Sequence, residues 1–188
     1  MKKTKHSNLL INRYSKCSQI WVETVIYTLI GLAIIGILLA IIKPAIDEKK
    51  DQIIIEQSLD MLNNIENQIE DVRYYGVGNS RPIEIKIKKG QLKINGEKDY
   101  LEFSIESKYT YSEPGENISI GKIIARTEKT GKKNDVSLTL DYSNKLNLTW
   151  NGKDEEKILN PSPSIYTITV TNIGKSKVDG ELINVDFS

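Results

Sequence analysis

The residue types that carry out most enzymatic and metal chemistry are scarce in this chain. There is one cysteine, Cys17, and one histidine, His6, and both precede the long apolar stretch of the sequence. A disulfide within the chain is therefore excluded, and a zinc site after that stretch would have to use carboxylates alone, which is rare. No nucleophile stands in a pattern with a base, and no glycine-rich phosphate loop occurs. We therefore expect no enzyme, no metal and no cofactor.

Two asparagines stand in the pattern that accepts N-linked glycans. Asn117 begins an Asn-Ile-Ser sequence, and Asn147 begins an Asn-Leu-Thr sequence. Such matches also arise by chance in an asparagine-rich chain, so both residues are candidates only. Asn147 alternates with Leu146 and Leu148, and we expect its side chain to point to solvent.

Residues 24–42 carry no charged side chain and have the length of a membrane-spanning helix. Nineteen residues extend about 28 Å as an α-helix, close to the bilayer core of about 30 Å. Residues 1–18 hold five basic residues and no acid, which predicts that this end stays in the cytoplasm and the C-terminal side is exported. The rest of the chain has 21 basic and 25 acidic residues. No basic patch stands clear of the acids, so we expect no nucleic-acid binding.

The length of the apolar run and the residues that follow it distinguish a secretory signal from a membrane anchor. A secretory signal has a shorter apolar region, of about 7–15 residues, and a small-residue cleavage site after it. Here the run exits through Ile-Ile-Lys-Pro-Ala at 41–45, which disfavours such a signal. An uncleaved single-pass anchor fits both the length and the flanking charge of the run.

The junction before the run resembles the class III signal of archaeal type IV pilins. Lys16, Cys17 and Ser18 precede Gln19, and the sequence QIWVETVIYTLIGLAIIG that follows is similar to the start of archaeal pilin-like proteins. The resemblance implies that a prepilin peptidase cuts between Ser18 and Gln19. Ser18 is a small residue, where family members usually carry Gly or Ala. Glu23 then occupies the fifth mature position, where that family has its glutamate.

Glu23 is an acid at the entrance of an otherwise uncharged run. At this depth a carboxylate can reach the lipid headgroups, so a tolerated interfacial acid is one interpretation. In the pilin family this glutamate fixes the axial register by meeting the freed α-amino group of a neighbouring subunit. Inside an apolar filament core an unpaired carboxylate is costly and a paired one is tolerable. The resemblance favours this second role.

A second helix pattern follows Pro44. Apolar residues repeat there at intervals of three and four, without an internal Gly or Pro: Ile55, Leu59, Leu62, Ile65, Ile69 and Val72. We expect Pro44, which has no amide hydrogen, to kink the helix or to begin a new one. The apolar stripe must bury against the head's own sheet or against neighbouring subunits, and a pilin-type protein would use both. Gly76 and Gly78 are expected to end the helix.

The remainder of the chain alternates apolar and polar residues in about eight short runs, which is typical of half-buried strands. Turn signals such as Asn95-Gly96 and Asn151-Gly152 separate the runs. This spacing predicts a small antiparallel β-sandwich. Within it we expect a strand at 118–125, an exposed polar loop at 127–135 and a charged loop at 153–157.

Together these patterns predict an α+β protein in which a long N-terminal hydrophobic helix is followed by an antiparallel β-sandwich head. Its expected parts are a basic leader at 1–18, a transmembrane or filament-core helix at 19–44, an amphipathic stalk at 45–75 and an extracellular head at 76–188.

The resemblance implies a structural subunit of an archaeal type IV pilus-like filament that serves adhesion or surface contact. Its partners would be the membrane, a prepilin peptidase, an assembly ATPase with its platform, and other pilin subunits in a homo- or heteropolymer. Two alternatives remain open: an uncleaved anchor that presents the sandwich as a binding module, and a minor pilin-like component of a secretion or uptake machine.

Overall fold

The computed structural model describes residues 8–131, 133–175 and 183–188, with side chains described within 21–131, 133–175 and 185–188. The chain divides into two units, Met1–Ile46 and Asp47–Ser188. One helix, α1 (Asn8–Tyr75), begins in the first unit and ends in the second. All described strands belong to the second unit.

Pro44 lies inside α1 and does not end it. A proline inside a helix removes one backbone hydrogen bond and crowds the carbonyl four residues before it. In this protein the helix nevertheless continues beyond Pro44. The alternative that a new helix begins at Pro44 is therefore wrong. Gly76 and Gly78 follow the last helical residue with φ of 89° and 86°, a backbone conformation that glycine adopts without strain. The predicted end of the helix is confirmed.

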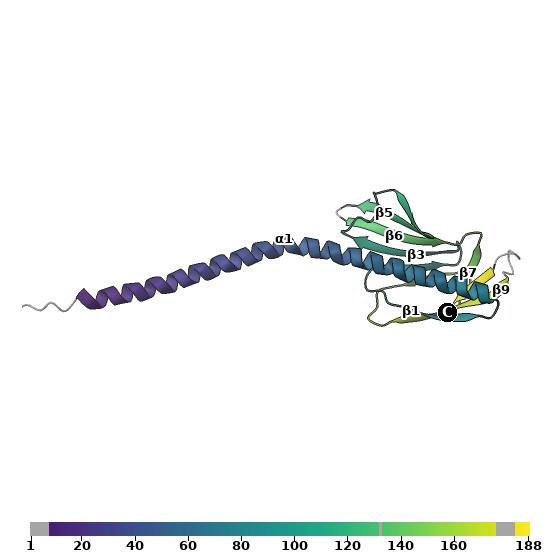
Figure 1. Cartoon of the computed structure of the whole chain (residues 1–188), viewed down its shortest axis with the longest axis horizontal. Helices are drawn as coiled ribbons and strands as arrows, with labels where there is room; N and C mark the ends of the chain where they lie inside the picture. The colour runs from purple at the N-terminus through teal and green to yellow at the C-terminus, as the bar shows by residue number, and fades with distance from the viewer. Residues whose placement is uncertain (1–7, 132, 176–182) are drawn as a thin grey trace, which may run out of the picture. The chain divides into compact units, whose positions relative to one another are not determined.

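Within the described residues, ten strands form two sheets (Figure 1). The four-stranded sheet has the order β1-β9-β10-β7, and its strands are β1 (Ser80–Ile85), β7 (Leu146–Trp150), β9 (Tyr166–Lys175) and β10 (Ile183–Phe187). The six-stranded sheet has the order β4-β5-β6-β3-β2-β8, and its strands are β2 (Gln91–Asn95), β3 (Tyr100–Ser107), β4 (Asn117–Ile120), β5 (Ile123–Thr130), β6 (Lys133–Asp141) and β8 (Glu156–Leu159). A long helix followed by two mostly antiparallel sheets makes the protein α+β.

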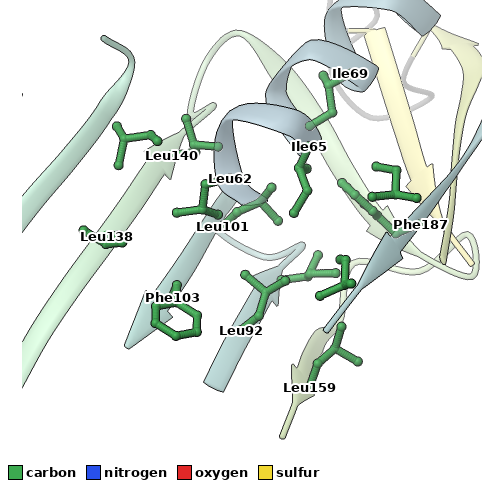
Figure 2. Close-up of a cluster of buried hydrophobic side chains, with 14 of the residues drawn as sticks. Leu62, Ile65, Ile69, Leu92, Leu101, Phe103, Leu138, Leu140, Leu159 and Phe187 are labelled. Atoms are coloured by element: carbon green, nitrogen blue, oxygen red, sulfur yellow. The ribbon is translucent and has the colours of Figure 1, made fainter. Parts of the chain in front are cut away.

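The second half of α1 and both sheets share one hydrophobic core. All six apolar positions predicted for the stripe are at most 8% exposed, which confirms the amphipathic helix. Figure 1 shows this part of α1 between the two sheets, and Figure 2 shows Leu62, Ile65 and Ile69 among Leu101 and Phe187, one residue from each sheet. The stripe is thus buried by the head's own strands. Each such side chain contributes about 1.5–3 kcal/mol relative to exposure.

Strand β3 and the second half of β6 alternate between core and solvent as their sequences predict. In β3 and β6 the buried residues pair directly across the ladder, Phe103 with Leu138 and Leu101 with Leu140. Because side chains alternate along a strand, their neighbours in sequence form the opposite, polar face of the sheet.

One strand pair departs from the antiparallel prediction: β10 runs parallel to β7. After β7 the chain crosses to the other sheet as β8 and returns as β9, and β10 then reverses beside β9. This route brings β10 alongside β7 in the same direction. Local alternation cannot reveal such a pairing, because it depends on where β9 lies.

Three segments differ locally from their predictions. The expected strand at 118–125 is divided into β4 and β5 by a turn at Gly121, whose φ is 60°. The expected polar loop at 127–135 is instead the end of a hairpin, in which Thr130 pairs with Lys133. Both faces of that end are exposed, so the sequence has no apolar alternation there. The charged loop at 153–157 is also shorter than expected, because β8 already begins at Glu156.

Candidate functional site

The first unit presents an apolar helical surface. From Trp21 onward α1 is long and apolar enough to cross a membrane, and none of its most apolar window is buried within the protein. Large side chains such as Trp21, Leu32 and Leu39 are 72%, 59% and 63% exposed. Monomeric soluble proteins rarely expose so continuous an apolar surface. This surface therefore requires an apolar environment, either lipid or other helices.

Glu23 lies on this surface next to Tyr27, one turn further along α1. The Tyr27 hydroxyl donates a hydrogen bond of 3.3 Å to Oε1 of Glu23. A carboxylate accepts up to about four hydrogen bonds, so this contact leaves room for a donor from outside the chain. The sequence does not predict this hydrogen bond between Tyr27 and Glu23.

The predicted cleavage bond between Ser18 and Gln19 lies within α1. The side chains of both residues lie outside the described part of the structure. Cleavage between them stays a prediction, as does the contact of a freed Gln19 amino group with Glu23.

In the second unit a buried polar network joins α1 to the six-stranded sheet. Glu66 is 7% exposed and accepts hydrogen bonds from the Tyr142 hydroxyl and from Nζ of Lys122. Nζ of Lys122 also donates to Glu70 at 2.8 Å, and Arg73 donates to the same carboxylate at 2.9 Å. A buried carboxylate is tolerated only with such partners, so this network fixes how α1 sits against the strands.

The contacts of this network shift the pKa values of Glu70, Lys122 and Tyr142. The hydrogen bond from Lys122 lowers the pKa of Glu70, and the hydrogen bonds to Glu66 and Glu70 raise the pKa of Lys122. Burial, reinforced by the hydrogen bond to Glu66, raises the pKa of Tyr142 far above its ordinary range. At neutral pH the Tyr142 hydroxyl therefore keeps its proton and acts as a donor.

Polar contacts also hold both ends of this part of α1. Near its start, Asp51 is 6% exposed and accepts hydrogen bonds from Nζ of Lys89 at 2.5 Å and from the backbone amide of Lys108 at 2.8 Å. Near its end, Asn172 of β9 donates to the carbonyl of Val72 at 3.1 Å. Helix and sheets are thus connected along the whole stripe.

Sequence reasoning missed these polar partners, although a signal existed. Asp51 lies four residues before Ile55, and Glu66 lies four residues after Leu62. Both therefore fall on the same helix face as the apolar stripe. An acid on a buried face needs a partner, so both could have been marked as contact residues, but their partners could not have been named.

The two glycosylation candidates lie in different environments. Asn117 is exposed in β4, an edge strand, and the Ser119 of its sequon is exposed as well. Asn147 is half-buried in β7. Thr149 of the same sequon is 2% exposed, and its hydroxyl donates a hydrogen bond of 2.7 Å to Asp186. Glycosyl transfer requires access to both the asparagine and the hydroxyl residue, and only the Asn117 sequon offers that in the folded protein.

Among the described residues, no group of His, Cys, Asp or Glu is arranged to hold a metal ion. No protein-family model, no curated protein and no solved structure matches the chain. Its function is therefore inferred from the geometry of its own residues.

Proposed function

We propose that the chain is a structural subunit of a type IV pilus-like filament of the archaeal kind, with α1 at the filament core and a sandwich-type head outside. One observation carries the proposal. α1 is a single helix whose apolar surface is unburied from Trp21 to Ile42 and whose later turns, from Ile55 to Val72, are buried by strands. A plain anchor has no need of a helix that continues into the core of its head.

Assembly would proceed without covalent chemistry by the subunit itself. The precursor lies in the membrane with its basic leader inside, and a prepilin peptidase cuts between Ser18 and Gln19. An assembly ATPase and its platform then move the subunit into the filament. The exposed side chains of residues 21–42 face lipid before extraction and other helices afterwards. Lipid tails are as apolar as leucine, so the gain comes from helix packing rather than from the hydrophobic effect.

Glu23 would set the axial register. The freed α-amino group of Gln19 on a neighbouring subunit supplies the outside donor for which the carboxylate has room. Within the same chain, the Tyr27 hydroxyl donates a hydrogen bond of 3.3 Å to this carboxylate. A paired charge in an apolar core is tolerated and an unpaired one is costly, so only one axial offset between neighbouring helices is favourable.

Two measurements test this proposal in cells that contain a prepilin peptidase and its assembly machinery. Intact mass should show a chain that starts at Gln19. Glu23→Gln should reduce the number of filaments seen by electron microscopy by at least about tenfold, because it removes the charge that pairs with the freed amino group, while processing is unchanged. The matched control is Glu48→Gln, an exposed acid beyond the apolar run, which should assemble normally.

An uncleaved, unassembled chain in the envelope beside an active peptidase would overturn the proposal. That outcome would favour a single-pass anchor that displays the head as a binding module. Normal filament formation by Glu23→Gln would show that Glu23 does not set the axial register. The intact mass, which shows whether the chain is cut before Gln19, would then decide between a filament subunit and an anchor.

A further inference from the structure

A shallow groove crosses the outer face of the six-stranded sheet, on the side opposite the core. Its lining side chains come from β3, β4, β5 and β6 and from the turns beside them. The strand register places them in two rows across the sheet. Glu102 lies beside Thr139 and then Ile124, and Ser137 lies beside Arg126 and then Asn117.

The chemistry of the lining excludes two classes of ligand. Ile124 is its one aliphatic side chain, so the groove has too little apolar area for a lipid or an apolar peptide. Lys98 and Arg126 are balanced by Glu102 and Asp141. A polyanion such as a nucleic acid needs a basic surface free of acids, which this groove does not offer.

Several lining groups are positioned to exchange hydrogen bonds with a ligand. Asp141 accepts a hydrogen bond from the backbone amide of Ser143 at 2.9 Å, and hydrogen bonds from Ser143 lower its pKa, so it stays ionised as an acceptor. Arg126 uses Nε for Glu128 at 2.9 Å, and a guanidinium carries four further N–H donors. Within the described residues the Glu102 side chain has no hydrogen bond or ion pair, although it is half-buried.

One aromatic ring completes the surface. Tyr100 stands at the start of β3, half-buried, and is paired across the ladder with Asp141. A ring at the edge of a polar groove offers an apolar face to C–H groups and a polar tip to water. Balanced charges, hydroxyls, a planar guanidinium and one ring match a ligand that is neutral, rich in hydroxyls and apolar only on its C–H faces.

We propose that this groove binds a neutral saccharide. The carboxylates of Glu102 and Asp141 accept hydrogen bonds from sugar hydroxyls, Arg126 donates to hydroxyl and ring oxygens, and Tyr100 packs against a C–H face. The inference rests on the proposed function for the exposure of the head outside the cell, and it deepens that function by naming a ligand class for adhesion.

The test uses the full chain in detergent micelles, produced without N-glycans because Asn117 lines the groove. The probes are neutral oligosaccharides of hexoses and N-acetylhexosamines, sulfated and uronate oligosaccharides, and single-stranded DNA. We expect binding to members of the neutral set, and titration calorimetry should then give the dissociation constant of the best one. Binding confined to the charged probes, or no binding to any probe at about 1 mM, overturns the proposal.

Variants locate the site. Glu102→Gln and Tyr100→Ala should each weaken binding by about tenfold or more, whereas Tyr100→Phe keeps the ring and should bind nearly as the wild type does. The controls are Glu84→Gln on β1 and Tyr74→Ala after the stripe, both exposed and outside the groove, with unchanged affinity expected. Equal loss in the controls, or retained binding in Glu102→Gln and Tyr100→Ala, overturns the assignment.

The two proposals fail separately. Glu102→Gln alters no residue of the apolar helix surface, so it should be processed and assembled normally. If the wild type forms filaments but binds no saccharide, only the proposal for the groove is overturned. If Glu23→Gln forms no filaments but still binds saccharide, the effect of the substitution is confined to the assembly surface.

Discussion

The hydroxyl of Tyr142, just after β6, donates a hydrogen bond to the buried carboxylate of Glu66 on α1. The two residues are 76 positions apart in the chain. Their contact lies in the middle of the helix stripe and connects it to the six-stranded sheet. Because both groups are almost inaccessible to water, neither can replace its partner by solvent, and the contact specifies how far along the sheet the helix sits.

Removing the Tyr142 hydroxyl should therefore lower the free energy of unfolding. Tyr142→Phe keeps the ring and leaves the Glu66 carboxylate short of one hydrogen bond, so we expect a loss of about 1–3 kcal/mol in the free energy of unfolding. Urea unfolding of the full chain in detergent, followed by circular dichroism, measures it. Tyr74→Phe is the control, since Tyr74 is 85% exposed, and its effect should stay within about 0.5 kcal/mol. Equal stability of the two variants would contradict the role of the contact.

Acid should weaken the same network through Glu70. Its pKa is lowered by Lys122 in the folded protein, so the folded state binds fewer protons than the unfolded one. The stabilisation is present above about pH 4.3, the ordinary pKa of glutamate, and is lost as the pH falls through the lowered value. Glu70 is partly exposed, so the effect at neutral pH is at most about 1 kcal/mol.

The matching measurement compares thermal unfolding of the wild type and Glu70→Gln from pH 7 downward. The stability gap between them should narrow as the pH falls below about 4.3. Glu84→Gln, at an exposed acid of β1, should follow the wild type throughout. A gap that stays constant with pH would show that Glu70 stabilises the fold through something other than its charge.

The two halves of α1 should respond differently to the same substitution. Leu62→Ala opens a cavity in the core, where the side chain is 0% exposed, and should cost about 2–5 kcal/mol in the unfolding of the head. Leu32→Ala, at a position 59% exposed, should leave that transition unchanged. Chemical denaturation in a Trp21→Phe background, in which Trp150 is the remaining tryptophan, distinguishes them by fluorescence. Similar losses from both would mean that the first part of the helix is also buried within the head.

Replacing Gly90 by alanine should destabilise the fold for two reasons. Its φ is 82°, and a Cβ there would lie 2.5 Å from the carbonyl oxygen of Ser104. Gly121 has a φ of 60° and open space around it, so Gly121→Ala should cost only the backbone strain of about 1–2 kcal/mol. Gly90→Ala should cost clearly more in the free energy of unfolding. A smaller loss for Gly90→Ala than for Gly121→Ala would contradict the observed packing.

If the head is exported in a host with N-glycosylation, Asn117 should carry more glycan than Asn147. The reason is access, because the Thr149 hydroxyl of the second sequon is buried and bonded to Asp186. Peptide mass spectrometry of the purified protein gives the two occupancies. Thr149→Ser and Ser119→Thr are matched exchanges that should not reverse the order. Preferential modification of Asn147 would mean that transfer occurs before β7 has paired.

The features that sequence reasoning predicted are those governed by burial along one element. The stripe from Ile55 to Val72 follows helical periodicity, and Leu101 and Phe103 follow strand alternation, because each side chain's direction is set by its neighbours in the chain. The sequence around Thr130 predicts a loop instead of the observed hairpin end, because neither face of that end is buried. Alternation is informative only where one face of a strand meets a core.

Hydrophobicity and backbone periodicity act between near neighbours in the chain. The order of the amino acids is therefore enough to identify residues 24–42 as an apolar helix of membrane length and to name the buried face of the following turns. The folded protein was needed to show that Glu66 meets Tyr142, that β10 runs parallel to β7, and that Glu102 and Arg126 border one groove. These relationships depend on strand order and register, which arise from contacts between segments far apart in the chain.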